Sequence, residues 1–208
     1  MWLVLSFLLT ALILEVLFRL GLTRFNPPAM MITSFIAAIL AVVWLRGKVG
    51  SGLSVGWRMN PFGLHLRVGF AIFLLSPIGM GIARLLQYYF DRDFREPSVL
   101  LVAGGGSLLL RILLLLSACV IVPVTEETVF RGLLFRGIRG RWGLFAGVVV
   151  SSAIFAVGHM DIFAALPLFI FSLGLAWSVE RTGSLVPAAI AHGLFNLFPL
   201  LLLNVMTL

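Results

Sequence analysis

The sequence predicts an all-α fold: a polytopic transmembrane bundle of about seven helices, within a range of six to eight. Of the 208 residues, 61% are hydrophobic and only 11% are charged, and the mean hydropathy is +1.14. Soluble domains carry about 25% charged residues, so this chain lacks the polar surface that a soluble protein needs. Several apolar stretches are also long enough to cross a hydrocarbon core of about 30 Å. These two observations place the chain in a membrane.

Seven apolar segments are separated by short breaks that are rich in proline, glycine or charge. We expect helices over residues 2–18, 30–45, 65 or 67–86, 108–135, 142–158, 162–177 and 185–203. The expected breaks are 26–28, 47–61, 91–97, the arginine cluster at 136–141, and a turn at 180–184. At 1.5 Å per residue, the segment 108–135 is too long for one straight crossing, so a kink or break near Pro123 is expected.

The charge balance agrees with a multi-pass protein of a prokaryotic plasma membrane. A net charge of +7 would suggest a nucleic-acid partner in a soluble protein. In a membrane protein the same surplus is expected from arginines in cytoplasmic loops, so we expect membrane lipid and no nucleic acid as partners. The single cysteine, Cys119, excludes an intramolecular disulfide. The oligomeric state and the sidedness are not written in the sequence.

Two adjacent carboxylates and an arginine interrupt the apolar run 108–135. Each charge at mid-bilayer costs from ~3 to more than 10 kcal/mol, so such residues indicate a function. Glu127 and Arg131 are four residues apart and can pair on one helical face, whereas Glu126 points away from Arg131. This spacing leaves Glu126 available as a general base. The structural alternative, an ion pair that braces the bundle, needs only one of the two glutamates.

Polar residues recur on two later apolar segments. His159 ends one of them, and a lone histidine there is more often an interfacial or core residue than a catalytic one. His192 and Asn196 share a helix face in the last segment, where each needs a hydrogen-bond partner and where interhelical hydrogen bonding is the alternative role. Helical rise puts Glu126 at roughly 20 Å and His159 at roughly 25 Å from the basic loop, so the two can lie at similar depths. His65, near an expected helix start, is interpreted as an interfacial residue.

Three motifs occur in order on three successive polar-bearing segments: Glu126-Glu127-x-x-x-Arg131, Phe155-x-x-x-His159 and His192-x-x-x-Asn196. Together they resemble the motifs of the CAAX prenyl protease and bacteriocin-processing (CPBP, or Abi) family of intramembrane endopeptidases. The resemblance covers roughly 108–203, with no departure at the motif positions. It implies that 105–208 form the catalytic helix core and that 1–104 are accessory transmembrane helices, within one integral membrane domain.

The resemblance also implies a role for each motif residue. Glu126 would activate a water molecule, and His159 would help to hold that water. His192 and Asn196 would stabilise the oxyanion on the scissile carbonyl, a contribution of about 10²–10³ in rate for each donor.

In the same resemblance, Glu127 and Arg131 would fix the helix and tune Glu126. A metal is the open question, because Glu126, His159 and His192 could supply three ligands to Zn²⁺ and leave a fourth position for water. A metal-bound Glu126 would no longer be free to act as the base. We therefore prefer a metal-free, glutamate-type mechanism with no required cofactor.

The expected activity is hydrolysis of a peptide bond near the C-terminus of a membrane-associated protein or peptide, either prenylated or C-terminally anchored. One alternative is a non-catalytic immunity or scaffold protein with the same fold. Another is a proton-coupled transporter, because buried carboxylates and histidines also form proton relays. No inverted repeat is visible, which disfavours the transporter.

Overall fold

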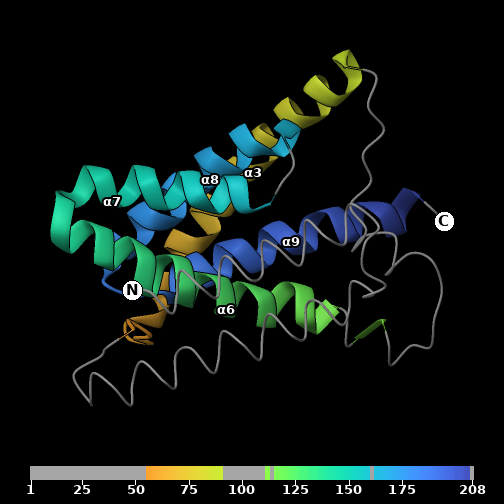
Figure 1. Ribbon diagram of the computed structural model, residues 1–208. Helices are drawn as coiled ribbons and strands as arrows, with labels where there is room; N and C mark the ends of the chain where they lie inside the picture. The colour runs from red at the N-terminus through yellow and green to blue at the C-terminus, as the bar shows by residue number, and fades with distance from the viewer. Residues whose placement is uncertain (1–54, 91–110, 113–114, 160–161, 207–208) are drawn as a thin grey trace, which may run out of the picture. The chain divides into compact units, whose positions relative to one another are not determined.

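The computed structural model describes residues 55–90, 111–112, 115–159 and 162–206 (Figure 1). All of them fall in one compact unit, Val55–Leu208. Every regular element in this described part is a helix, which confirms the predicted fold class. The helices expected over 2–18 and 30–45 and the loop at 91–97 lie outside the described residues, so the total of about seven helices stays a prediction.

Length and composition identify three membrane-spanning helices among the described residues. These are Phe62–Ala83, Ser117–Gly158 and Ile162–Thr182, and a shorter apolar helix covers Val186–Leu201. A helix of about 20 apolar residues spans the hydrocarbon core, so the chain is an integral membrane protein, as the composition predicts.

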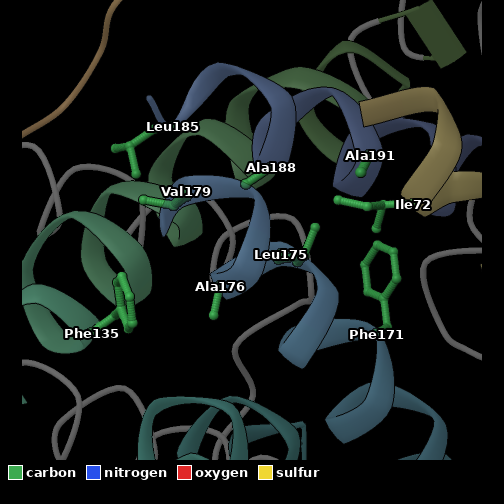
Figure 2. Packing of buried hydrophobic residues seen from close by; sticks show 9 residues of the cluster. All are labelled: Ile72, Phe135, Phe171, Leu175, Ala176, Val179, Leu185, Ala188 and Ala191. Atoms are coloured by element: carbon green, nitrogen blue, oxygen red, sulfur yellow. The ribbon is translucent and has the colours of Figure 1, made fainter. Parts of the chain in front are cut away.

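Three of the helices pack around one apolar core. Helix α3 (Phe62–Tyr89) contacts both α8 (Ile162–Thr182) and α9 (Val186–Met206). Figure 2 shows Ile72 of α3 directed toward Phe171 of α8. The buried residues of this cluster are Ile72, Phe135, Phe171, Leu175, Ala176, Val179, Leu185, Ala188 and Ala191. Small side chains on α9 allow close helix packing, which is how transmembrane helices gain contact area.

The expected break near Pro123 is replaced by a change of hydrogen-bonding pattern within a continuous helix. The elements are a π-helix η2 (Ser117–Ile121), α6 (Val122–Glu127), a second π-helix η3 (Thr128–Phe135) and α7 (Arg136–Gly158). Backbone dihedral angles are helical before the proline, at Ile121 and Val122, and after it, at Glu127 and Thr128. Proline lacks an N–H and its ring crowds the preceding turn, and the wider π-turn accommodates both effects.

The chain reverses direction inside α7. Gly143 has φ 85° and ψ 174°, a conformation that glycine adopts at little cost. The later part of α7 consequently packs back against η3 (Figure 1). The bend lies one residue after the start predicted for the helix 142–158, because the strained backbone position requires a glycine and Trp142 cannot supply one.

The predicted turn at 180–184 is too long. Helix α8 continues through Thr182, and the chain turns only at Gly183, which has φ 65°. Ser184 stabilises this turn by donating its hydroxyl to the carbonyl of Arg58 (2.7 Å), and Leu185 N–H donates to the carbonyl of Gly56 (2.9 Å). The bond to Gly56 gives a partner to the N–H of Leu185, next to the start of α9, where N–H groups have no acceptor within the helix.

Candidate active site

The paired carboxylate of the first motif is fully enclosed. Glu127, the last residue of α6, has no exposed surface, and Arg131 of η3 is 1% exposed. Arg131 Nη1 donates to Glu127 Oε1 over 3.1 Å. The pair expected from the four-residue spacing is therefore present, because the π-helical turns keep the two side chains on one face.

Arg131 also joins the first motif to two other helices. Its Nη2 donates to Ser172 Oγ of α8 over 2.7 Å, and its guanidinium lies 4.4 Å from the ring centroid of Phe155 on α7. Cation–π contact with a desolvated ring adds to the stability of such a buried cation. Sequence reasoning missed Ser172, since one serine in an apolar helix carries no signal of its partner.

His192 binds the same carboxylate, a contact that the sequence did not predict. Its Nδ1 lies 2.9 Å from Glu127 Oε1, and both groups are buried. Because Oε1 also accepts from Arg131, the carboxylate acts as the acceptor and His192 Nδ1 carries the hydrogen. The ring therefore presents Nε2 to the other side, where Glu126 Oε2 lies 3.8 Å away.

The environment of Glu126 differs from that of its neighbour. Its side chain is 29% exposed, whereas that of Glu127 is not exposed at all. Among the described residues no donor forms a hydrogen bond with Glu126 Oε2, and the 3.8 Å to His192 exceeds hydrogen-bond length. The adjacent glutamates thus have separate environments. Glu127 is fully buried and its Oε1 accepts from two donors, while its Oε2 has no partner among the described residues. Glu126 is partly exposed, and its Oε2 faces the His192 ring without a hydrogen bond from the described residues.

Phe155 brings the two histidines to one place. Its ring centroid is 4.7 Å from that of His159 and 5.7 Å from that of His192, and the Phe171 ring flanks His192 at 6.3 Å. His159 Nδ1 lies 2.8 Å from the carbonyl oxygen of Phe155. A carbonyl only accepts, so Nδ1 carries the hydrogen, and Nε2 of the neutral ring is an acceptor.

Asn196 lies one turn beyond His192 on α9. Its Nδ2 donates to the carbonyl of Ala118 in η2 over 2.9 Å, which leaves the second N–H of the amide for another acceptor. Helix α9 comes close to η2 here because Gly193 has no side chain: a Cβ at Gly193 would overlap the carbonyl oxygen of Cys119.

The environment of His65 adds what the sequence did not predict. Its side chain is fully buried, and among the described residues neither ring nitrogen has a hydrogen-bond partner. Its interfacial position stays a prediction. His65 sits four residues before Gly69, where α3 approaches α9 so closely that an added Cβ would be 2.8 Å from the Pro187 carbonyl oxygen. Helix α3 begins at Phe62, a few residues earlier than expected, so His65 lies in its first turn.

The suggested zinc ligands do not form a three-ligand set. Within the described ranges, no three His, Cys, Asp or Glu side chains are placed to hold a metal ion. Glu126 and His192 face each other. The Nδ1 atoms of His159 and His192 are engaged by oxygen acceptors, which leaves the two Nε2 atoms as the ring nitrogens that could bind a ligand. No reaction step is derived through a metal, and the metal-free mechanism stays a prediction.

Comparison with known proteins shows which family this part of the chain is similar to. Residues 106–198 match the model of a family described as "Type II CAAX prenyl endopeptidase Rce1-like". All six predicted site residues lie within the matched range: Glu126, Glu127, Arg131, His159, His192 and Asn196.

Three curated proteins are also similar to the chain. A Bacillus subtilis protein named "Putative membrane peptidase YdiL" is 24% identical over 167 residues, which cover 80% of this chain and 68% of that protein. The UPF0177 protein YxdF of Lactococcus lactis is 32% identical over 80 residues, covering 38% of this chain and 44% of its own length. An "Uncharacterized 24.3 kDa protein" of Escherichia coli is 34% identical over 78 residues, covering 35% and 36%.

No solved structure matches the chain. At the level of the family, the matches indicate a membrane-embedded protease of the CAAX type. The predicted family resemblance is confirmed: residues 106–198 of this integral membrane protein are similar to the Rce1-like type II CAAX prenyl endopeptidases.

Proposed function

We propose that this chain is a glutamate-dependent intramembrane endopeptidase. It hydrolyses a peptide bond near the C-terminus of a membrane-associated protein or peptide, prenylated or C-terminally anchored. The observation that carries the proposal is the contrast between the two adjacent carboxylates. Glu127 is fully buried and its Oε1 accepts from Arg131 and His192, whereas Glu126 is 29% exposed and its Oε2 faces an imidazole across 3.8 Å.

Glu126 is the general base in this proposal. A water molecule hydrogen-bonded to Glu126 Oε2 can donate a proton to it and attack the scissile carbonyl carbon as hydroxide. His159 assists, since its Nε2 accepts a hydrogen bond when Nδ1 donates to the Phe155 carbonyl. The shared contact of both histidines with the Phe155 ring supports placing the water between these groups.

His192 and Asn196 serve as oxyanion donors. Nδ1 of His192 already donates to Glu127, so Nε2 donates only when the ring is doubly protonated. In that state the two carboxylates, Glu126 and Glu127, balance the cations Arg131 and His192, and the buried cluster carries no net charge.

The reaction closes with the same groups. Hydroxide attack converts the carbonyl into a tetrahedral oxyanion that accepts from His192 Nε2–H and from the second N–H of Asn196. The protonated Glu126 then donates its proton to the departing nitrogen, the C–N bond breaks, and the carboxylate is restored. Glu127 and Arg131 do not exchange protons, and they hold His192 and the helix in place.

The test is Glu126→Gln in the full-length protein reconstituted in liposomes. Two internally quenched probes are compared: a farnesylated peptide with a CAAX-type end, and an unprenylated peptide with a C-terminal transmembrane anchor. We expect the wild type to cleave at least one probe and Glu126→Gln to cleave neither. The control is Glu180→Gln, which removes a carboxylate outside the three motifs that pairs with Arg139.

A membrane proteome comparison completes this experiment. Cells that express the wild type should accumulate C-terminally shortened membrane proteins that cells with Glu126→Gln lack. If the two strains share one proteome and one phenotype, the chain acts as a scaffold or immunity protein. If Glu126→Gln abolishes proton-coupled uptake with no change in the proteome, the transporter is the correct function.

A further inference from the structure

The amide of Asn196 is held by a backbone carbonyl inside a helix, which is an unusual acceptor. Carbonyl groups within a helix normally accept from the N–H four residues later. Ala118 belongs to the π-helical turn η2, and its oxygen accepts from Asn196 Nδ2 over 2.9 Å. A carbonyl without its own helical donor would be the most favourable acceptor for such a bond.

The local backbone explains why the Ala118 carbonyl is available. Its α-helical donor would be the N–H of Val122, but that group donates to Ser117 in the π-helical pattern. Its π-helical donor, five residues on, would be Pro123, which has no N–H. Both backbone donors are thus lost. Ala118 is half-buried, and a carbonyl shielded from water without a partner is unfavourable by up to about 1–3 kcal/mol, so a donor from another helix is favoured.

The approach of α9 delivers that donor. Gly193 lets the α9 backbone lie against the Cys119 carbonyl, and Asn196 follows three residues later on the side of the helix that meets η2. Helix α9 contacts both η2 and α6, so this approach is part of an extended contact. The bond between Asn196 and Ala118 consequently fixes the orientation of the amide and directs its second N–H elsewhere.

We propose that Pro123 is a positioning residue for the oxyanion donor Asn196. By withholding an N–H from the Ala118 carbonyl, it preserves the acceptor that orients the Asn196 amide. This inference rests on the proposed function, and it adds a residue outside the three motifs. Pro123 itself is fully buried and touches no reacting group in this mechanism.

The variant Pro123→Ala supplies the missing N–H. The Ala118 carbonyl can then be satisfied within its own helix, and the Asn196 amide loses its fixed orientation. Removing an oxyanion donor costs about 10²–10³ in kcat, which sets the upper limit of the effect. We expect kcat on the cleaved probe to fall about tenfold, with KM changed less than about twofold, because an oriented donor acts on the transition state.

A double-mutant cycle separates positioning from a general structural effect. Pro123→Ala should lower kcat in the presence of Asn196 but have little further effect in Asn196→Ala. The matched control is Pro77→Ala, a proline inside α3 with an exposed side chain, which should leave kcat unchanged. The proposal would be overturned if Pro123→Ala lowered kcat equally with Asn196 and with Asn196→Ala. It would also be overturned if a folded Pro123→Ala variant had the wild-type kcat.

A second variant keeps the test decisive if Pro123→Ala does not fold. Replacing Pro123 with lactic acid introduces a backbone ester, which lacks both the ring and the N–H. We expect this protein to retain near wild-type kcat, because only the absence of the N–H matters. A loss comparable to that of Asn196→Ala would assign the effect to the ring and refute the inference.

A measurement without substrate distinguishes this inference from the proposed function. Asn196→Ala should lower the apparent Tm more in the wild-type background than in Pro123→Ala, where the Ala118 carbonyl no longer needs the amide. If Glu126→Gln is fully active, the protease proposal fails whatever this cycle shows. If Glu126→Gln is inactive while both cycles are additive, only the role of Pro123 is refuted.

Discussion

Replacing each of the two adjacent glutamates with glutamine should have opposite consequences for stability and for catalysis. Glutamine has nearly the same shape as glutamate, so each change mainly removes one charge. Glu127 accepts from Arg131 at 3.1 Å and from His192 at 2.9 Å, with all three side chains buried. Glu126 is 29% exposed and has no hydrogen bond to Oε2 from any described residue.

The magnitudes follow from these contacts. Hydrogen bonds to a charged group contribute about 1.5–3 kcal/mol each, and removal of one partner from a buried ion pair costs about 3–5 kcal/mol. We therefore expect Glu127→Gln to lower the free energy of unfolding by about 3–5 kcal/mol, because Arg131 is left buried without its counter-charge. Glu126→Gln loses only a contact at 3.8 Å, which is longer than a hydrogen bond, so we expect a change below about 1 kcal/mol.

The assay unfolds both variants by denaturant titration in the same bicelles and compares their free energies of unfolding. Cleavage of the probe is measured in parallel. Glu126→Gln should be folded and inactive, whereas Glu127→Gln should be unstable and retain some activity where it is folded. The reasoning would be refuted if Glu126→Gln were as unstable as Glu127→Gln. It would be refuted equally if Glu127→Gln had wild-type stability.

Three further outcomes are expected. Gly193→Ala should destabilise the protein by about 1–3 kcal/mol and reduce cleavage, because the new Cβ meets the backbone carbonyl of Cys119. Gly137→Ala should be neutral, because an added Cβ there has no atom within 4 Å, and thermal unfolding compares the two variants. Ser172→Ala should lower the free energy of unfolding by about 1–3 kcal/mol, because it removes the hydroxyl that accepts from Arg131 Nη2. The kcat of the folded variant should stay within a few fold of the wild type, and a much larger loss of kcat would contradict this. Cleavage should be insensitive to chelators, and elemental analysis should find no stoichiometric metal; one tightly bound zinc per chain would overturn the metal-free mechanism.

The sequence alone determined the class of the fold and the local chemistry of the first motif. Hydropathy requires membrane-spanning helices, because only helices satisfy every backbone group within one segment in lipid. The pairing of Glu127 with Arg131, and the separate direction of Glu126, follow from helical spacing over a few residues. Boundaries were less predictable: the turn at 143 and the extension of α8 to Thr182 depend on single glycine positions.

Only the tertiary structure decided which side chains meet between helices. His192 reaches Glu127 across 65 positions of sequence, Arg131 reaches Ser172 across 41, and Asn196 reaches Ala118 across 78. These contacts depend on how each helix is rotated and how far it slides along its neighbour, and lipid-like sequences leave both nearly free because apolar faces differ little in energy. Close approach at small residues and the few buried hydrogen bonds select one arrangement, and that arrangement leaves one carboxylate free in front of an imidazole.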